Sequence, residues 1–270
     1  MELLVLGVLI LGKSQNSDII GYMEHLIIAN WKSNPINLKE ANNIFSNYLK
    51  LGKKLKNKKI IACLPYLYLL LGEKLKSNKI FLGTQNIFPE TNGSFTGEIK
   101  IDMLKNLNIN YAIVGHSERR KLGDSNEYIN KQISLILKNK ITPIFCIGEQ
   151  KRDHDGKYLS FVKEQIIKGL NDINKNYIKN IIFAYEPVWA IGSDAIREAT
   201  KEEFIEMKIY IRKILSDLYG SKIASSVKII YGGSVNSKNA KIFIDASADG
   251  LLIGRDSLNI KNFESILNSF

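Results

Sequence analysis

AYEPVWAIG, at residues 184–192, marks the point where an apolar run ends in a carboxylate and the chain turns on a proline. Residues 181–184 have the composition of a buried strand, so Glu186 lies where that strand would open into a loop. A carboxylate held in a dry pocket at such a position can act as a base. Pro187 fixes its own φ and favours an extended backbone at Glu186. Glu186 is therefore the first candidate for chemistry, although a glutamate that only ends a strand fits this stretch equally well.

The same unit, a short Ile/Val-rich run followed by a helical pattern, is found along the chain from residue 23 onward. Strands are expected at residues 26–30, 60–64, 79–86, 111–115, 141–149, 180–186, 227–233 and 250–254. Helices are expected at residues 38–55, in a segment ending at 76, around Met103, at 127–138, 158–174, 201–219 and 237–245, and at the end of the chain. Strands that are apolar almost throughout are typical of a parallel sheet covered by helices.

Eight strand–helix pairs are the number that closes a barrel. We therefore predict the α/β class and a (β/α)8 TIM barrel, built as a single domain over residues 23–270. An open, doubly wound sheet of eight strands is the alternative. It would need a glycine-rich dinucleotide-binding turn after the first strand, where the sequence has Asn30-Trp31-Lys32-Ser33 instead.

Residues 1–22 do not fit this pattern. The apolar run LLVLGVLIL at residues 3–11 is too short to span a bilayer. It follows Glu2 rather than the basic segment that begins a signal peptide. We predict that residues 1–22 are an N-terminal extension outside the fold, and we expect no membrane partner.

The composition is that of a soluble globular chain with a full core, at 45% hydrophobic and 24% charged residues. The formal net charge of +11 would suit nucleic acid, an anionic membrane or a small phosphorylated substrate. The lysines are spread over polar helix faces and form no basic block interleaved with aromatic residues. We therefore expect no nucleic-acid partner.

The cysteines indicate a reducing compartment and no metal. Cys63 and Cys146 both lie in apolar, strand-like runs, as buried thiols do in reducing surroundings such as the cytoplasm. Neither they nor the three histidines have the spacing of metal ligands. We expect a cytoplasmic protein without a bound metal.

In a parallel barrel all strand C-termini meet at one face, so polar residues directly after the strands should form one site. Those residues are Asn30, Lys32, Gln85, Asn86, His116, Ser117, Glu118, Glu149, Glu186, Gly232, Gly233, Ser234 and Gly254. The glycines after the last two strands, together with Gly192, suit a phosphate cradle of backbone N–H groups. Any single glycine at a strand end can also be an ordinary turn former.

Two side chains of this set can carry charge or move protons. Lys32 follows a strand end closely enough to reach an anionic substrate, although most lysines of this chain are expected on the solvated surface. His116 follows a strand directly and precedes residues 117–120, SERR, which can start a helix. A helix N-terminus disfavours imidazolium, so a neutral His116 could donate a hydrogen bond to a developing oxyanion. A structural histidine is the alternative.

Six motifs together resemble those of the triosephosphate isomerases. They are Asn30-x-Lys32, GSFTGE (93–98), GHSERR (115–120), CIGE (146–149), AYEPVWAIG (184–192) and YGGSV (231–235). The resemblance covers residues 25–270, and the order and spacing of the motifs also fit. It implies an isomerase of glycolysis and gluconeogenesis that interconverts dihydroxyacetone phosphate and D-glyceraldehyde 3-phosphate through an enediol or enediolate, without cofactor or metal.

The resemblance also implies roles for individual residues. Glu186 would be the base and His116 the electrophile, a pairing that is the known pattern of this family and is taken over from it. Lys32 would supply fixed positive charge and Asn30 a hydrogen bond, with Glu118 as a supporting partner of Lys32. The positions expected to contact substrate or phosphate are Asn30, Lys32, Gly192, Ser234, Gly254 and Arg255.

Two loops have implied functions as well. The loop at 187–200 would be a lid that excludes water from the reaction intermediate. The loop at 93–98 would insert into a second copy of the chain, with Thr96 and Glu98 near the partner's site, so a homodimer is expected.

The sequence departs from the family pattern at two places near the substrate. Six residues, 193–198, stand between Gly192 and Ala199 where the family usually has four. After the last strand the usual paired glycines become Gly254-Arg255, and a positive φ at Arg255 would be strained. Two alternatives therefore stay open at this point, an isomerase of a related phosphosugar and a catalytically inactive barrel kept for binding.

Overall fold

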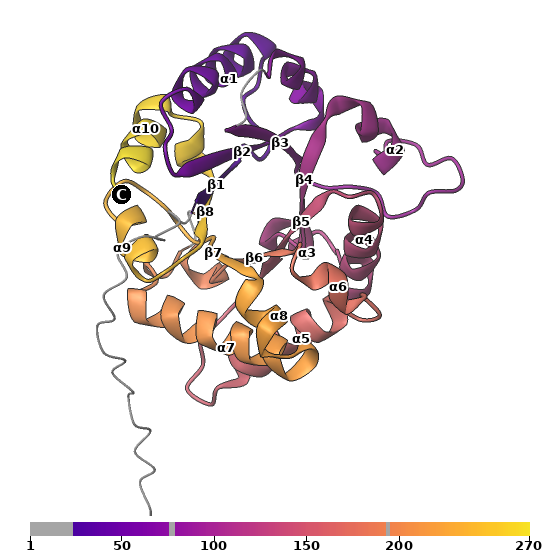
Figure 1. The fold of residues 1–270 in the computed structure, drawn as a ribbon, viewed down its shortest axis with the longest axis vertical. Coiled ribbons are helices and arrows are strands. Elements are labelled where there is room, and N and C mark those ends of the chain that lie inside the picture. The colour runs from indigo at the N-terminus through magenta and orange to yellow at the C-terminus, as the bar shows by residue number, and fades with distance from the viewer. Residues whose placement is uncertain (1–23, 76–78, 193–194) are drawn as a thin grey trace, which may run out of the picture.

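Eight parallel strands close into a barrel in chain order. The structure is a computed structural model that describes residues 24–75, 79–192 and 195–270. In Figure 1 the strands ring the centre and the helices form an outer ring around them. The strands are β1 (His25–Asn30), β2 (Lys58–Leu64), β3 (Ile80–Thr84), β4 (Ile109–Val114), β5 (Thr142–Ile147), β6 (Ile182–Tyr185), β7 (Lys228–Tyr231) and β8 (Gly250–Ile253).

The ring is closed by the pairing of the first strand with the last. Ile27 of β1 lies opposite Ile60 of β2 on one side and opposite Leu251 of β8 on the other. This confirms the predicted (β/α)8 barrel and shows that the open-sheet alternative was wrong.

Both faces of each strand are buried, which explains why the strands are apolar almost throughout. In β1, Ile28 belongs to the cluster inside the barrel, whereas Ile27 and Ala29 belong to the larger cluster between barrel and helices. The interior cluster is made by alternate residues of the strands, because side chains alternate between the two faces. It contains Leu26, Ile28, Ile61, Cys63, Ile113, Ile144, Cys146, Ile182, Ala184, Ile230 and Leu252.

The outer layer contains most of the predicted helices, with small shifts at their ends. The α-helices are α1 (Leu38–Gly52), α2 (Ile101–Leu104), α3 (Ser117–Lys121), α4 (Asn126–Lys138), α5 (Lys157–Gly169), α6 (Lys175–Ile178), α7 (Lys201–Tyr219), α8 (Ser221–Ser226), α9 (Ala240–Asp245) and α10 (Ile260–Asn268). The 3-10 helices are η1 (Tyr66–Lys74), η2 (Lys105–Leu107), η3 (Val188–Ala190) and η4 (Arg255–Ser257).

The helix expected to end at residue 76 differs in type, since η1 is a 3-10 helix. Its buried side chains are Tyr68, Leu69 and Leu71. The helix expected at 158–174 is shorter in the structure, since α5 ends at Gly169 and a separate turn, α6, follows. The predicted extension at residues 1–22 lies outside the described residues, so the domain boundary at residue 23 stays a prediction.

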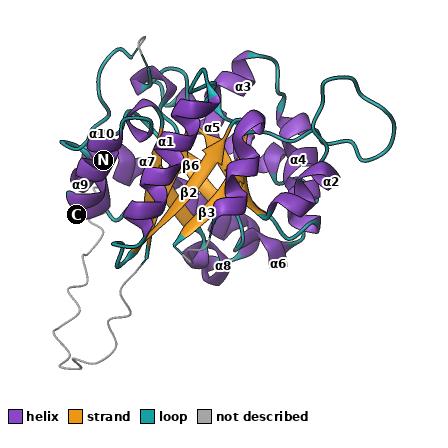
Figure 2. Ribbon diagram, turned by 90° about the horizontal axis from the view of Figure 1, so that it is seen from above, coloured by secondary structure: helices purple, strands orange, loops and turns teal. Residues whose placement is uncertain are grey.

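The two ends of the barrel differ in what surrounds them. In the side view of Figure 2, α3 lies at one end and α6 and α8 at the other. Because α3 directly follows β4 whereas α6 and α8 precede β6 and β7, the end with α3 is where the strand C-termini open. The polar residues that follow the strands are thereby brought to this end. No helix in the described ranges is long and apolar enough to cross a membrane.

Candidate active site

Glu186 stands directly after β6 at the open end of the barrel. Its N–H donates to the Ile147 carbonyl of the neighbouring strand at 2.8 Å, which fixes the backbone at the strand end. The residue is only 2% exposed. Its Oε2 accepts the Ser117 N–H at 3.0 Å, and its Oε1 lies 3.2 Å from Nε2 of His116. The carboxylate is therefore held in a largely dry place beside an imidazole, as expected for a base.

His116 is the N-cap of α3, and its ring is oriented by that helix. Nδ1 accepts the Glu118 N–H at 3.2 Å, so in this arrangement the ring proton is on Nε2, the nitrogen that faces Glu186. The turn before α3 is held by the half-buried Arg120 side chain, whose Nε donates to the Gly115 carbonyl at 2.7 Å. These contacts bring together the two residues that the sequence analysis put at the centre of the site.

Lys32 has an unusual backbone conformation that its neighbours hold in place. Its φ of 52° is left-handed, which is uncommon outside glycine. The Lys32 N–H donates to Oδ1 of Asn30 at 3.0 Å, and Nε2 of Gln85 donates to the Lys32 carbonyl at 2.9 Å. Asn30 and Gln85 therefore shape the turn from which the lysine side chain enters the site.

The expected pair between Lys32 and Glu118 is present. The Lys32 ammonium donates to Oε1 of Glu118 at 2.6 Å. Partial burial raises the pKa of Glu118, but neighbouring groups, led by the hydrogen bond and positive charge of Lys32, hold that pKa below its ordinary value. Glu118 is therefore a carboxylate that neutralises much of the charge of Lys32.

The loops after β7 and β8 present free backbone N–H groups. Within the described part of the chain, the N–H groups of Gly233, Ser234 and Gly254 donate to no other group. A Cβ at Gly233 would lie 2.1 Å from the Tyr231 hydroxyl, so this glycine is required by a close approach rather than by a positive φ. These loops suit an anion that accepts from several N–H groups at once.

The backbone strain that a positive φ would cause at Arg255 does not occur. Its φ is not positive. In the described residues a positive φ outside glycine occurs at Lys32, Asn108, Lys140, Asp172 and Ser247. Arg255 instead begins the short helix η4.

These residues enclose a pocket of about 450 Å³ at the open end of the barrel. All nine predicted site residues line it: Asn30, Lys32, His116, Glu118, Glu186, Gly192, Ser234, Gly254 and Arg255. Gln85, Asn86 and Glu149 do not line it. Asn236 and Asp256 do, although the sequence analysis gave them no role. Asn236 lies a few residues after β7 and Asp256 a few residues after β8. Polar residues further from each strand end than those considered above can therefore also reach the pocket.

Glu149 supports the loop that follows Glu186. Its buried Oε1 accepts from the Tyr185 hydroxyl and from the Trp189 indole N–H, both at 2.8 Å. Burial raises the pKa of Glu149 above its ordinary value. The Arg197 guanidinium lies 4.4 Å from the centre of the Trp189 ring. The loop is thus anchored on both sides of residues 193 and 194, which lie outside the described residues, and the predicted lid motion stays a prediction.

The end of this loop is joined to α7 by a capping box. Thr200 Oγ1 accepts the Glu203 N–H at 3.2 Å, and Glu203 Oε2 accepts the Thr200 N–H at 2.8 Å. Arg197 donates to both Glu203 oxygens, at 2.6 and 2.9 Å, and this pairing is the main reason why the pKa of Glu203 falls from 4.5 to about 2.

We expect Glu203→Gln to lower the melting temperature at pH 7 by about 2–4 °C, because the amide can still complete the helix cap but loses the charge pairing with Arg197. Because the folded-state pKa is depressed, the stabilisation is complete above pH 4.5 and is lost as the pH falls towards 2. The melting-temperature gap should therefore narrow from pH 7 to pH 3 in calorimetric scans. Glu202→Gln is the matched control in the same helical turn. A gap that stays constant with pH would contradict the assignment.

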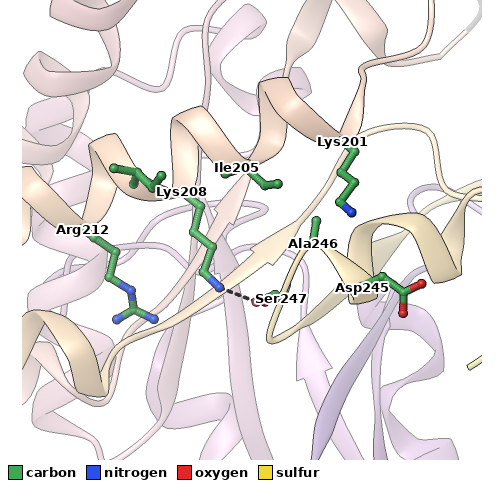
Figure 3. A pocket seen from close by; sticks show the side chains of 8 residues that line it. Lys201, Ile205, Lys208, Arg212, Asp245, Ala246 and Ser247 are labelled. Atoms are coloured by element: carbon green, nitrogen blue, oxygen red, sulfur yellow. Dashed lines mark hydrogen bonds between the residues drawn. The ribbon is translucent and has the colours of Figure 1, made fainter. Parts of the chain in front are cut away.

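A second pocket, of about 490 Å³, lies on the outer wall of the barrel between α7 and α9. Figure 3 shows its lining, with Lys208 turned towards the backbone of Ser247, whose carbonyl accepts from the lysine ammonium. Burial lowers the pKa of Lys208. This pocket has no imidazole and its single carboxylate, Asp245, is paired with Lys241. The pocket at the strand ends is therefore the candidate active site.

In residues 24–75, 79–192 and 195–270, no group of three or more His, Cys, Asp or Glu side chains could hold a metal ion. Cys63 and Cys146 are both free and buried.

Known proteins with similar sequences share one description. The family model described as triosephosphate isomerase matches residues 25–270. A triosephosphate isomerase of Dictyoglomus turgidum is 39% identical over 249 residues, which cover 90% of this chain and 98% of that protein. Triosephosphate isomerases of Orientia tsutsugamushi strain Ikeda and Aquifex aeolicus are 40% and 39% identical over 252 and 253 residues. Each of these alignments covers 92% of this chain, with 98% of the Orientia protein and 100% of the Aquifex protein.

Proposed function

This chain belongs to the triosephosphate isomerase family, and on that premise we propose that it interconverts dihydroxyacetone phosphate and D-glyceraldehyde 3-phosphate, with Glu186 as the base. The reaction is a step of glycolysis and gluconeogenesis. The observation that carries the proposal is the 3.2 Å approach of Glu186 Oε1 to His116 Nε2 in a pocket of about 450 Å³ at the strand ends.

Glu186 accepts the proton from the carbon beside the substrate carbonyl and returns it to the neighbouring carbon. This role is supported by its burial and by the Ser117 N–H, which holds one carboxylate oxygen while the other faces His116. A carboxylate with one oxygen fixed and one directed at the reacting atoms needs little rearrangement during proton transfer.

His116 donates its Nε2 proton to the carbonyl oxygen as charge develops there and recovers a proton from the other oxygen of the enediolate. The role is supported by the Glu118 N–H, which occupies Nδ1 and leaves the ring proton on Nε2. A donor oriented in advance towards a developing oxyanion stabilises the transition state more than the ground state.

Lys32, Asn30 and the loops after β7 and β8 bind the substrate. Lys32 supplies positive charge from a turn that Asn30 and Gln85 hold in a left-handed conformation. The free N–H groups of Gly233, Ser234 and Gly254 receive the phosphate oxygens, with Gly192 contributing from the loop after β6. The adjacent N–H of Arg255 belongs to the same cradle.

A coupled assay tests the proposal directly. Purified protein is supplied with D-glyceraldehyde 3-phosphate, and the formation of dihydroxyacetone phosphate is followed through a reductase that consumes it. Turnover with this triose that exceeds turnover with a four-carbon ketose phosphate supports the proposal. A preference for the larger sugar phosphate would assign the site to a related isomerase instead.

We further propose that the chain acts as a homodimer through the loop at 93–98. In both ribbon views the chain between β3 and α2 projects away from the barrel. Phe95 in this loop is 42% exposed, although its ring packs 4.6 Å from that of Phe88. Lys100 donates to the carbonyls of Thr91 and Gly93, so the loop has internal structure without a partner. An ordered projection that carries a partly exposed aromatic ring suits insertion into a second copy.

Phe95→Glu is expected to convert the dimer to a species with the mass of one chain, because the carboxylate would lose its hydration when the loop inserts into the partner. Light scattering after size exclusion measures this. Leu122→Glu, which adds the same charge at another exposed apolar position, is the control. A wild-type protein that already elutes with the mass of one chain would refute the proposed dimer.

We also assign the protein to the cytoplasm. The assignment is supported by Cys63 and Cys146, which are free thiols, as expected in a reducing compartment.

A further inference from the structure

The side chains that line the active-site pocket carry more formal negative than positive charge, which disfavours the binding of a phosphorylated substrate. Besides His116, five ionisable side chains line it, the cations Lys32 and Arg255 and the carboxylates Glu118, Glu186 and Asp256. Two cations against three carboxylates leave one formal negative charge. A phosphate monoester adds about −1.5 to −2 at neutral pH. Binding of the substrate phosphate therefore depends on a pocket cation that is not already paired with a carboxylate.

Lys32 is already engaged by a carboxylate of the same pocket. Its ammonium lies 2.6 Å from Glu118 Oε1. In residues 24–75, 79–192 and 195–270, by contrast, no group forms an ion pair or hydrogen bond with the Arg255 guanidinium. Arg255 is thus the pocket cation that forms no ion pair with a neighbour in the described chain.

The backbone that carries Arg255 is firmly held. Ser257 donates to the Gly254 carbonyl through both its N–H, at 2.9 Å, and its hydroxyl, at 2.6 Å. The buried Tyr48 hydroxyl in turn donates to the Ser257 carbonyl at 2.5 Å. A Cβ at Gly254 would lie 3.5 Å from Cε of Lys32, so the residue before Arg255 adjoins the stem of the other cation. Arg255 is therefore presented from a rigid support at the edge of the pocket.

We propose that the Arg255 guanidinium contacts the substrate phosphate and is a specificity-determining residue that favours the doubly charged phosphate group. This inference rests on the proposed isomerase function and concerns the side chain, whereas the cradle described above uses backbone N–H groups. A guanidinium presents paired donors that match phosphate oxygens and keeps its charge at all physiological pH values. Backbone N–H groups supply hydrogen-bond donors without a full charge, so the Arg255 guanidinium adds a full positive charge to the phosphate site.

The test compares Arg255→Gln and Arg255→Lys with the wild-type full chain. For Arg255→Gln, the dissociation constant of inorganic phosphate in calorimetric titrations is expected to rise about tenfold. The KM for D-glyceraldehyde 3-phosphate should rise by a similar factor, with kcat changed less than about threefold, because the contact is made in ground state and transition state alike. Arg255→Lys keeps the charge and should lose about threefold.

Two further measurements separate this role from a structural one. Turnover of D-glyceraldehyde, which lacks the phosphate, should be the same in Arg255→Gln and wild type. Lys238→Gln, which removes a positive charge from an exposed position in the same corner but outside the pocket lining, should leave both phosphate affinity and KM unchanged.

The outcomes distinguish the two proposals. Unchanged phosphate affinity in Arg255→Gln, or an equal loss with phosphorylated and unphosphorylated substrate, would overturn the role of Arg255 while leaving the isomerase function in place. A wild-type protein that binds phosphate but turns over no triose phosphate would overturn the proposed function. In that case the calorimetric comparison still decides whether Arg255 supplies the anion-binding charge.

Discussion

Glu186→Gln is expected to lower kcat by about 10³-fold while substrate affinity stays within about tenfold. The amide oxygen of glutamine can still accept the Ser117 N–H that now holds Oε2, so the side chain should keep its place. It cannot accept a proton from carbon, however. Because the shape of the pocket is preserved and only the base is lost, the effect should fall on kcat rather than on binding.

The measurement is steady-state kinetics in both directions, with affinity taken from inhibition by a non-reacting triose phosphate analogue. Glu202→Gln makes the same chemical change on the exposed first turn of α7 and should leave the rates unaltered. Near-normal turnover in Glu186→Gln would remove the assignment of the base, and with it the proposed mechanism.

The second large effect is expected at His116. His116→Ala should reduce kcat by about 10²- to 10³-fold, the usual consequence of removing one oriented donor to an oxyanion. The substitution also frees the Glu118 N–H that Nδ1 accepts, so the first turn of α3 loses its cap. The loss of the cap can be distinguished from a loss of catalysis. It lowers the melting temperature, but it does not by itself lower the rate per folded molecule.

Rates are therefore normalised to the folded fraction, measured by circular dichroism at the assay temperature. His154→Ala, at an exposed histidine away from the pocket, is the control. A loss of rate that disappears after normalisation would make His116 a structural residue, the alternative that the sequence pattern also allowed.

The architecture was predictable because the signal is local and repeated. Each strand is buried on both faces, so each appears in the sequence as an apolar run, and eight such runs alternating with helical patterns specify a closed parallel barrel. The errors occurred where periodicity is weak. The apolar segment at 66–74 does not distinguish an α-helix from the 3-10 helix η1, and no strong pattern marks the end of α5 at Gly169 and the separate turn α6.

The composition of the site was also predictable, since strand C-termini of a barrel converge and polar residues there are conspicuous among apolar neighbours. Its internal contacts were not, apart from the Lys32–Glu118 pair expected from the family resemblance. The hydrogen bond from Ser117 to Glu186, for example, joins residues that lie 69 positions apart in the sequence.

By itself, then, the sequence determined the barrel, the set of side chains at its open end and the family to which they belong, because those properties follow from short-range patterns of polarity. Only the tertiary structure decided how close the charges of the site lie to one another and which of them stays unpaired. The pair of Lys32 and Glu118 was expected from the family resemblance, but nothing in the order of residues indicates that Arg255 has no such partner in the described chain. The reason is physical: charge pairing acts over a few ångströms in space, and folding alone sets those distances.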